Sequence, residues 1–170
     1  MSFVIRRAKS EDVTGIAKVH VDSWRTTYKG IVSDEYLSNL TYESRKKIWD
    51  SAVPRGDVYV AVDEKDEIVG FSCGGLERSG DYPSYKGEIY AIYLLEEFQG
   101  KGLGKKLVEP IIKDLVDRGV YTMLVLVLAE NKARFFYESL GAKEIDQVEV
   151  TIGEKPYTEI VYAWDDIRTV

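Results

Sequence analysis

The 170-residue chain has a single cysteine, Cys73, and a single histidine, His20. An intrachain disulfide is therefore impossible, and two such side chains cannot build a Cys/His zinc site, so we expect no metal. No apolar run approaches the roughly 18 residues that span a bilayer. The N-terminus also lacks the long apolar stretch of a signal peptide. These absences predict a cytoplasmic protein without a membrane anchor.

The chain also has fewer basic than acidic residues. The chain has 23 Lys and Arg against 29 Asp and Glu, which gives a formal net charge of −6. Nucleic-acid-binding domains carry a basic surface, so we expect no nucleic-acid partner. An acidic protein attracts cations, and a cationic amine is one such partner. The length and the 45% hydrophobic content are those of one ordinary globular domain, and we predict a single domain over residues 1–170.

The spacing of apolar residues predicts strands and helices in the order β-α-α-β-β-β-α-β-α-β-β. Cysteine 73 falls inside an apolar strand with no basic neighbour in sequence, where most thiols are inert. The order favours an α/β fold with a mixed sheet and helices on both faces. The expected elements are a strand at 3–8, a helix from an N-cap at Ser10 to about 28, a helical region at 33–52 broken near 40–41, a hairpin from 57 to 76, a strand at 88–95, a helix at 102–119, a buried strand at 121–129, a helix at 131–140, and strands at 143–152 and 157–164.

A glycine-rich segment between a strand and a helix is the most informative stretch of the sequence. It reads Gln-Gly-Lys-Gly-Leu-Gly from Gln99 to Gly104. Glycines allow a ligand close to the backbone, and free amides at a helix N-terminus bind phosphate oxygens. Lysines 101, 105 and 106 oppose the helix dipole, which makes sense where a polyanion binds. A solvated glycine turn with surface lysines is the alternative.

Two common phosphate motifs do not fit this segment. Counted from Gly100, the nucleotide P-loop requires glycine at position 105, where the chain has lysine, and no Ser or Thr follows. The dinucleotide fingerprint requires a small residue where Leu107 stands. Neither a P-loop nor a dinucleotide-binding site is expected.

The segment resembles the pyrophosphate loop of the GNAT superfamily of acyl-CoA-dependent N-acetyltransferases, Gln/Arg-x-x-Gly-x-Gly/Ala. A second stretch, AENKARFFYESLGA, is similar to the family's Asn-x-x-Ala/Arg…Phe-Tyr-x-x-x-Gly-Phe helix. It departs from that pattern at Ala142, where the family has Phe. The resemblance covers nearly the whole chain and implies a GNAT-like, mainly antiparallel central sheet flanked by helices on both faces.

The resemblance implies acetyl-CoA as co-substrate. In relatives a bulge in the central strand opens backbone groups to the pantetheine, and we place this region at 91–94, within one or two residues. Asn131 is expected to contact the pantetheine or phosphate arm, or alternatively to N-cap its helix. The residues implied in cofactor binding are Ile92, Tyr93, Leu94, Gln99, Gly100, Lys101, Gly102, Leu103, Gly104, Lys105, Asn131 and Phe136.

Acetyl transfer to an amine needs proton transfers at two places. An amine with a pKa of about 10.4 is only ~0.04% neutral at pH 7, and only the neutral form attacks a thioester. By resemblance, Glu88 is the base, acting directly or through a water, and Tyr137 is the acid that protonates the departing thiolate. The alternatives are an exposed glutamate at a strand start and a tyrosine in the core. A direct attack in a ternary complex is expected, with no acyl group on Cys73.

Aromatic residues of the first helix and of the loop after the hairpin form the expected acceptor side. Trp24, Tyr28 and Tyr82 are the candidate substrate-binding residues, with Tyr36 and Tyr85 nearby and acidic residues 22, 34, 35 or 81 to neutralise an amine. Residues 24 and 28 are equally consistent with helix packing, and His20 is expected to be structural. We expect a small polyamine-like or amino-acid-like acceptor. A protein N-terminal or lysine acetyltransferase, a silent acyl-CoA-binding module and a homodimer stay open.

Overall fold

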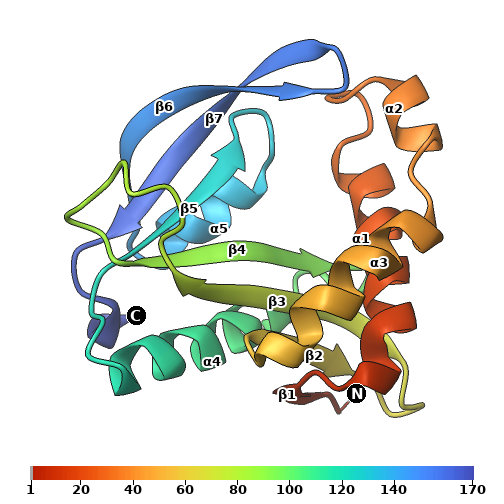
Figure 1. Ribbon diagram of the computed structural model, residues 1–170, viewed down its shortest axis with the longest axis horizontal. Coiled ribbons are helices and arrows are strands. Elements are labelled where there is room, and N and C mark those ends of the chain that lie inside the picture. The colour runs from red at the N-terminus through yellow and green to blue at the C-terminus, as the bar shows by residue number, and fades with distance from the viewer. Residues whose placement is uncertain (1) are drawn as a thin grey trace. The chain divides into compact units, whose positions relative to one another are not determined.

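A computed structural model describes residues 2–170 (Figure 1). The strands form one seven-stranded sheet in the order β1-β2-β3-β4-β5-β7-β6, which is mostly antiparallel. Only β4 and β5 are described as a parallel pair. The elements are β1 (Val4–Arg7), α1 (Val13–Thr27), α2 (Asp34–Ser38), α3 (Tyr42–Ala52), β2 (Val58–Val62), β3 (Ile68–Leu76), β4 (Gly87–Leu94), α4 (Leu103–Asp117), β5 (Met123–Leu128), α5 (Ala133–Ser139), β6 (Lys143–Ile152) and β7 (Lys155–Trp164).

The chain forms two compact units, which divide β3, β4 and α4 between them. The first unit comprises residues 1–74 and 91–111, and the second comprises residues 75–90 and 112–170. In the first unit α1 and α3 lie side by side (Figure 1). Its core includes a cluster of Ala61, Val69, Leu103 and Leu107, all nearly inaccessible to solvent. The start of α4 is therefore anchored on β2 and β3 by apolar packing.

The second unit is built around the strands β5, β7 and β6. Strand β5 pairs with β7 along its whole length, from Met123 to Leu128, and β6 and β7 form a long hairpin (Figure 1). Five of the six β5 residues are buried, which agrees with the expectation of a strand covered on both faces. The burial of Leu124, Val161 and Ala163 holds these strands together.

Side-chain directions show that β4 contains one irregularity. A Cβ atom at Gly87 would lie 2.7 Å from a methyl carbon of Leu115, so position 87 faces α4. Farther along, Ile92 and Leu94 pack against the cluster that includes the first turns of the same helix. Side chains of a regular strand alternate between faces, so positions 87 and 94 require one break in the alternation. With Ile89 buried on the same side as position 87, the break lies between Ile89 and Ile92.

The fold class and most elements are confirmed, but several local expectations are wrong. Ser10 is not the N-cap of the first helix: it opens a 3₁₀ turn over Ser10–Asp12, and α1 begins at Val13. The carboxylate of Asp12 accepts from the Lys9 amide at 2.8 Å and from Arg6 at 2.7 Å. This ion pair fixes the turn before the helix, so a serine cap is not needed.

Other boundaries differ by one to three residues. Helix α5 begins at Ala133 and not at Asn131, and β7 begins at Lys155 and not at Tyr157. The break between α2 and α3 is where it was expected, with Thr41 as the N-cap of α3. Helix α4 is assigned continuously through Pro110. Within residues 2–170, no helix combines the length and the hydropathy of a membrane span.

Candidate active site

The segment from Gln99 to Lys105 combines two glycines of positive φ with the start of a helix. Gly100 and Gly102 have φ angles of 74° and 81°, in the left-handed region that favours glycine. Helix α4 begins at Leu103, and the amide of Lys106 donates to the Gly102 carbonyl at 3.4 Å. The backbone amides that precede Lys106 in the first turn of α4 have no acceptor within the helix. They are therefore available to the oxygens of a phosphate.

Interactions on either side hold this loop in place. The side-chain amide of Gln99 donates to the carbonyl of Leu94 at 3.1 Å and ties the loop to the end of β4. The amide of Phe98 donates to the Leu95 carbonyl at 2.9 Å. Leu103 is only 1% exposed and anchors the far end in the core. The role of Gln99 that the structure shows is thus support of the loop through its side chain.

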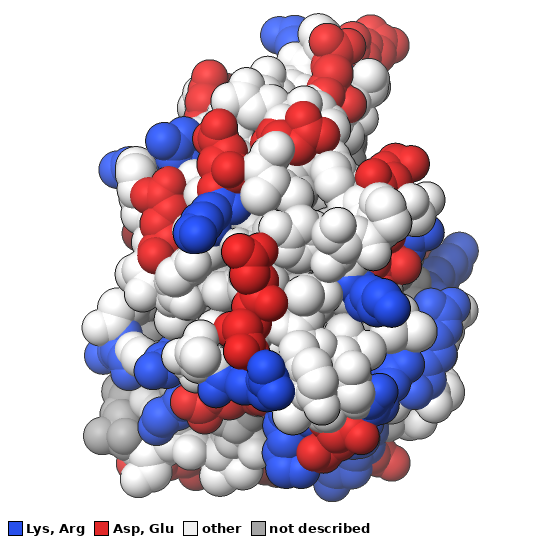
Figure 2. All heavy atoms as spheres, turned by 90° about the vertical axis from the view of Figure 1, so that its left-hand side faces the viewer, with Lys and Arg blue, Asp and Glu red and all other residues white. Residues whose placement is uncertain are grey.

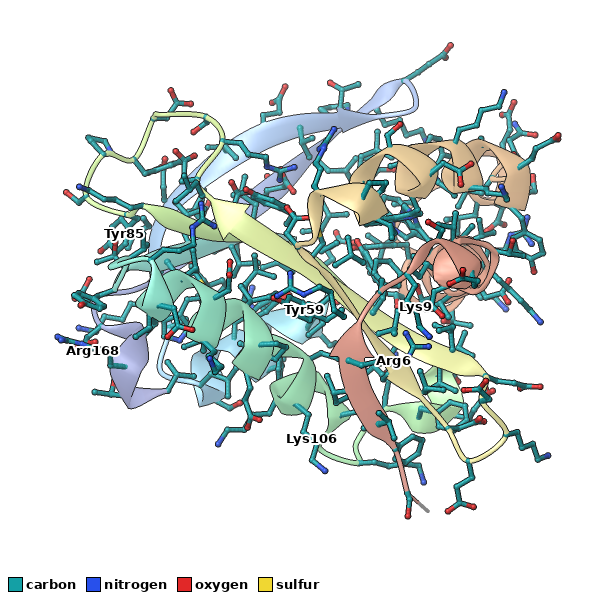
Figure 3. All side chains as sticks on the ribbon, turned by 60° about the horizontal axis from the view of Figure 1, so that its bottom comes forward. Arg6, Lys9, Tyr59, Tyr85, Lys106 and Arg168 are labelled. Atoms are coloured by element: carbon teal, nitrogen blue, oxygen red, sulfur yellow. The ribbon has the colours of Figure 1, made fainter. Side chains whose placement is uncertain are left out.

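Exposed lysines surround the loop. Lys101 and Lys106 line a hollow of about 540 Å³ together with Ser2, Phe3 and Leu103. Figure 3 shows Lys106 projecting away from the ribbon at the start of α4. On the face drawn in Figure 2, acidic and basic side chains are interspersed. A group of lysines around a helix N-terminus is unfavourable by itself and is stabilised by a bound polyanion.

The predicted acceptor residues Trp24 and Tyr28 lie in one aromatic cluster of the first unit. Their ring centroids are 4.4 Å apart, and Trp24 also lies 6.2 Å from Tyr36 and 6.5 Å from Tyr93. Tyr28 is buried, in line with the packing alternative, while Trp24, Tyr36 and Tyr93 are half-buried. Because Tyr93 belongs to β4, the cluster lies against the strand that was predicted to contact the pantetheine.

His20 connects this aromatic cluster to α3. The indole N–H of Trp49 donates to His20 Nδ1 at 3.0 Å, and the imidazole stacks on Tyr93 at 5.8 Å with an interplanar angle of 14°. Burial, and secondarily the charge of Arg45, lowers the pKa of His20 to about 4. The ring is therefore neutral at pH 7 with its proton on Nε2, as a structural histidine would be.

Glu88, the predicted base, is a buried and ion-paired carboxylate. One oxygen accepts from the Arg78 amide at 3.1 Å, and the other accepts from the Arg78 guanidinium at 2.9 Å. The glutamate is 5% exposed, so it is not the exposed strand-start residue of the alternative reading. Burial and the charge of Glu88 together raise the pKa of Glu159 on β7. The negative charge of Glu88 therefore acts on the carboxylate of Glu159.

The residues of the second motif lie in α5 or just before it. Tyr137 is 4% exposed, and its ring lies 5.4 Å from Phe136 and 6.2 Å from Trp164. Asn131 accepts from the Ala133 amide at 2.9 Å, but the N-cap residue of α5 is Lys132 and not Asn131.

Tyr82 and Cys73 have partners of a structural kind. The hydroxyl of Tyr82 donates to Asp146 of β6 at 2.7 Å, and burial together with this bond raises its pKa to about 12. In the same way Tyr85 donates to Asp165 at 2.7 Å. Buried Cys73 lies 3.8 Å from a carboxylate oxygen of Asp57. A carboxylate neighbour does not favour a thiolate, which agrees with an inert cysteine.

Comparison with known proteins decides the family. The model of the acetyltransferase (GNAT) family matches residues 18–142. The chain is also 39% identical over 166 residues to the uncharacterized N-acetyltransferase YuaI of Bacillus subtilis (strain 168), which covers 98% of this chain and 95% of that protein. The chain belongs to the GNAT family. It is an acetyltransferase, and the predicted family and fold are confirmed.

Other GNAT proteins resemble the chain along most of its length. The spermidine N(1)-acetyltransferase of Thermoplasma acidophilum is 28% identical over 153 residues, which is 86% of this chain and 91% of that protein. The crystal structure of PaiA N-acetyltransferase from Thermoplasma acidophilum, in complex with coenzyme A, superposes with a TM-score of 0.77 at 25% identity. It covers 96% of this chain and 98% of that chain.

The GNAT motifs located the loop and α5, but they did not point to Arg78 or Arg45. Arg78 and Arg45 were missed because both lie outside the motifs and single charged residues carry no periodic signal. Arg45 stands one helical turn before Trp49, and that spacing on an apolar helix face was the available hint. Among residues 2–170, no group of three His, Cys, Asp or Glu side chains is arranged to hold a metal ion.

Proposed function

We propose that the protein transfers the acetyl group of acetyl-CoA to the primary amine of a small molecule, by direct attack in a ternary complex. The observation that carries the proposal is the loop at 99–105. Two left-handed glycines precede the first turn of α4, whose first amides have no acceptor within the helix, and Lys101 and Lys106 line the adjoining hollow. This arrangement suits a diphosphate better than a single carboxylate, because it offers several donors and several positive charges.

The irregularity in β4 supports the placement of the acyl arm. The ladder between β4 and β5 ends at Ile89 and Val125, although both strands continue beyond that pair. The stretch of β4 after Ile89 lies outside this ladder. We assign the pantetheine to Ile92, Tyr93 and Leu94, and an amide in this stretch to the oxyanion of the tetrahedral intermediate.

The chemistry requires one proton to leave and one to arrive. The neutral amine attacks the thioester carbonyl carbon, the C–S bond breaks, and the ammonium proton passes to a base. We assign this base to Glu88, acting through a water, with the guanidinium of Arg78 fixing the carboxylate. Tyr137 gives its phenolic proton to the departing thiolate, and solvent restores it.

Other acceptors and roles are supported by separate observations. The [ribosomal protein bS18]-alanine N-acetyltransferase of Haemophilus influenzae is 40% identical over 83 residues, which is 49% of this chain and 53% of that protein. This likeness keeps a protein N-terminus as the second candidate acceptor. A silent acyl-CoA-binding module would keep the loop and dispense with Tyr137 and Glu88. A cytoplasmic location and a homodimer stay proposals.

The loop assignment is tested by Gly102→Glu. We expect its affinity for CoA, measured by titration calorimetry, to fall by at least about tenfold, because the side chain strains the backbone and places a carboxylate beside the diphosphate. Gly80→Glu is the matched control: Gly80 has a φ of 77° and open space around it, like Gly102. Equal CoA binding by both variants and the parent protein would overturn the loop assignment.

The acceptor class is tested by a screen of amines with a free-thiol readout. Release of CoA thiol that depends on a small amine supports the proposal. Release only with a peptide bearing a free N-terminus supports the second candidate. Binding of CoA without thiol release from any amine or peptide supports the silent module.

A further inference from the structure

The aromatic cluster around His20 contains two buried hydrogen-bond donors without acceptors. The indole N–H of Trp24 and the Nε–H of Arg45 are both shielded from solvent, and neither has a hydrogen-bond partner among residues 2–170. A buried donor left unsatisfied costs about 1–3 kcal/mol, and more when the group is charged. Such a group in a native structure calls for an explanation, and an acceptor supplied by a ligand is one.

Arg45 also lacks a counter-ion. Within residues 2–170, no Asp or Glu forms an ion pair with it, although six other such pairs are present. A guanidinium is always charged in proteins, and a half-buried charge is stabilised by an anion. Asp22, the nearest acidic candidate on α1, accepts instead from the hydroxyl of Tyr42 at 2.7 Å.

Trp24 and Arg45 lie near the same contact between α1 and α3. His20 on α1 contacts Trp49 on α3, and these helices lie side by side. Trp24 lies one helical turn after His20 on α1, and Arg45 lies one turn before Trp49 on α3. In an antiparallel pair of helices, both residues are therefore one turn from the contact between His20 and Trp49. The ring of Trp24 is 6.4 Å from that of His20, and the charge of Arg45 acts on the imidazole.

The half-buried members of the cluster include a residue of β4. His20, Trp24, Tyr36 and Tyr93 are half-buried, whereas Trp49 and Phe71 are 5% and 0% exposed. Tyr93 stands in the stretch to which the acyl arm is assigned, and its ring lies 6.5 Å from that of Trp24. A small molecule held by Trp24 and Arg45 would therefore lie beside the position where an amine must attack.

We propose that Arg45 and Trp24 bind a carboxylate of the acceptor, so that the substrate is an amino acid or a closely related small amine with a free carboxylate. The proposal rests on the acetyltransferase function proposed above. An arginine fork and an indole N–H are donors that match carboxylate oxygens, and the surrounding rings provide an apolar wall for a side chain. A polyamine has no group that would satisfy either donor, and Arg45 would repel it.

The test compares acids with their amides. Each of the twenty standard L-amino acids and its carboxamide is offered with acetyl-CoA, alongside spermidine, and thiol release is measured. We expect the best acid to exceed its carboxamide in kcat/KM by at least about tenfold, because charge-assisted hydrogen bonds are lost in the amide. Equal rates for acids and carboxamides, or spermidine as the best acceptor, would overturn the proposal.

Variants assign that preference to the two residues. Arg45→Gln should raise the KM for the acid by at least about tenfold with little change in kcat, and should abolish the preference over the carboxamide. Trp24→Phe keeps a ring without the N–H and should raise the KM by a smaller factor. Lys47→Gln, on the exposed side of the same helix, is the control and should change neither.

Two further measurements separate a failure of this proposal from other failures. Calorimetric CoA binding and thermal melting of each variant show whether the protein is folded and binds the co-substrate. If thiol release with amines persists and Arg45→Gln leaves the acid preference intact, the carboxylate assignment is wrong while the acetyltransferase proposal stands. If the parent protein neither binds CoA nor releases thiol with any amine, the proposed function fails and this assignment fails with it.

Discussion

At the scale of single residues, Tyr137 and Glu88 differ in how their surroundings suit them to proton transfer. Tyr137 is held by rings, which fix its orientation without adding charge. Glu88 has its carboxylate engaged by Arg78, and this direct ion pair holds it in one orientation. An ion-paired carboxylate is well oriented, and it works most effectively as a base through a water that it polarises.

Removal of the proposed acid should slow turnover without weakening co-substrate binding. For Tyr137→Phe we expect kcat to fall by about 100-fold, because general acid catalysis typically contributes that much or more. CoA affinity by calorimetry should change by less than about twofold. Tyr121→Phe, which alters an exposed tyrosine packed on Arg168, is the control. A Tyr137→Phe protein that keeps parental kcat across pH 6–10 would show that the tyrosine serves packing alone.

Glu88→Gln tests the proposed base. The amide keeps the shape of the side chain but cannot accept the proton, so kcat should fall by about 100-fold. Arg78→Gln, which releases the carboxylate, should retain a base and lose much less activity. The assignment fails if Glu88→Gln lowers the melting temperature while its kcat and pH profile match those of the parent.

At the scale of elements, the sequence predicted the long periodic segments well. The apolar run of β5 and the heptad-like spacing of α4 determine strand and helix because burial dominates there. The GNAT-like loop was located by residue type, since Gly100 and Gly102 take φ angles that other residues avoid. The break between α2 and α3 was found from Leu40–Thr41, where a threonine cap follows an apolar residue.

Tertiary contacts account for what the sequence did not predict. The turn before α1 depends on the Arg6–Asp12 ion pair, which joins a strand to a helix start and leaves no local pattern. The pairing of Glu88 with Arg78 joins residues ten positions apart across a loop. The donors of Trp24 and Arg45 become informative only once their partners can be searched for in space. Their residue types alone are ordinary for helices.

The contact between α1 and α3 should make stability depend on pH through His20. Its pKa is about 4 in the folded protein, against an ordinary value of 6.5. The unfolded chain therefore takes up the proton more readily, so the stabilisation is present above pH 6.5 and is lost as the pH falls toward 4. Between pH 7.5 and 5.0 the loss from this group amounts to about 2 kcal/mol.

Urea unfolding at these two pH values measures the effect. His20→Gln keeps an acceptor for the Trp49 indole but has no proton to gain, so its free energy of unfolding should change less over the same interval. The difference between the two slopes isolates the histidine, because all other titrating groups are common to both proteins. Identical slopes would contradict the lowered pKa.

At the scale of the whole molecule, an acidic protein carries a small basic region where it is proposed to bind a polyanion. The net charge is −6, yet Lys101, Lys105 and Lys106 fall within six residues of one another. The field of the rest of the chain favours cations, whereas this region favours anions at short range. The proposed acceptor needs both properties, since an amino acid has an ammonium group and a carboxylate.

The conformation of the 99–105 loop has a consequence for how the protein can change over time. Where recognition is achieved by main-chain amides, most side chains of the segment can be exchanged without loss of the ligand, provided that the glycines at 100 and 102 are retained. The co-substrate site therefore tolerates most substitutions of its side chains. The helices around His20 have no such protection, because there each contact is made by a particular side chain. New acceptors can accordingly be acquired in that region while the acyl donor stays the same.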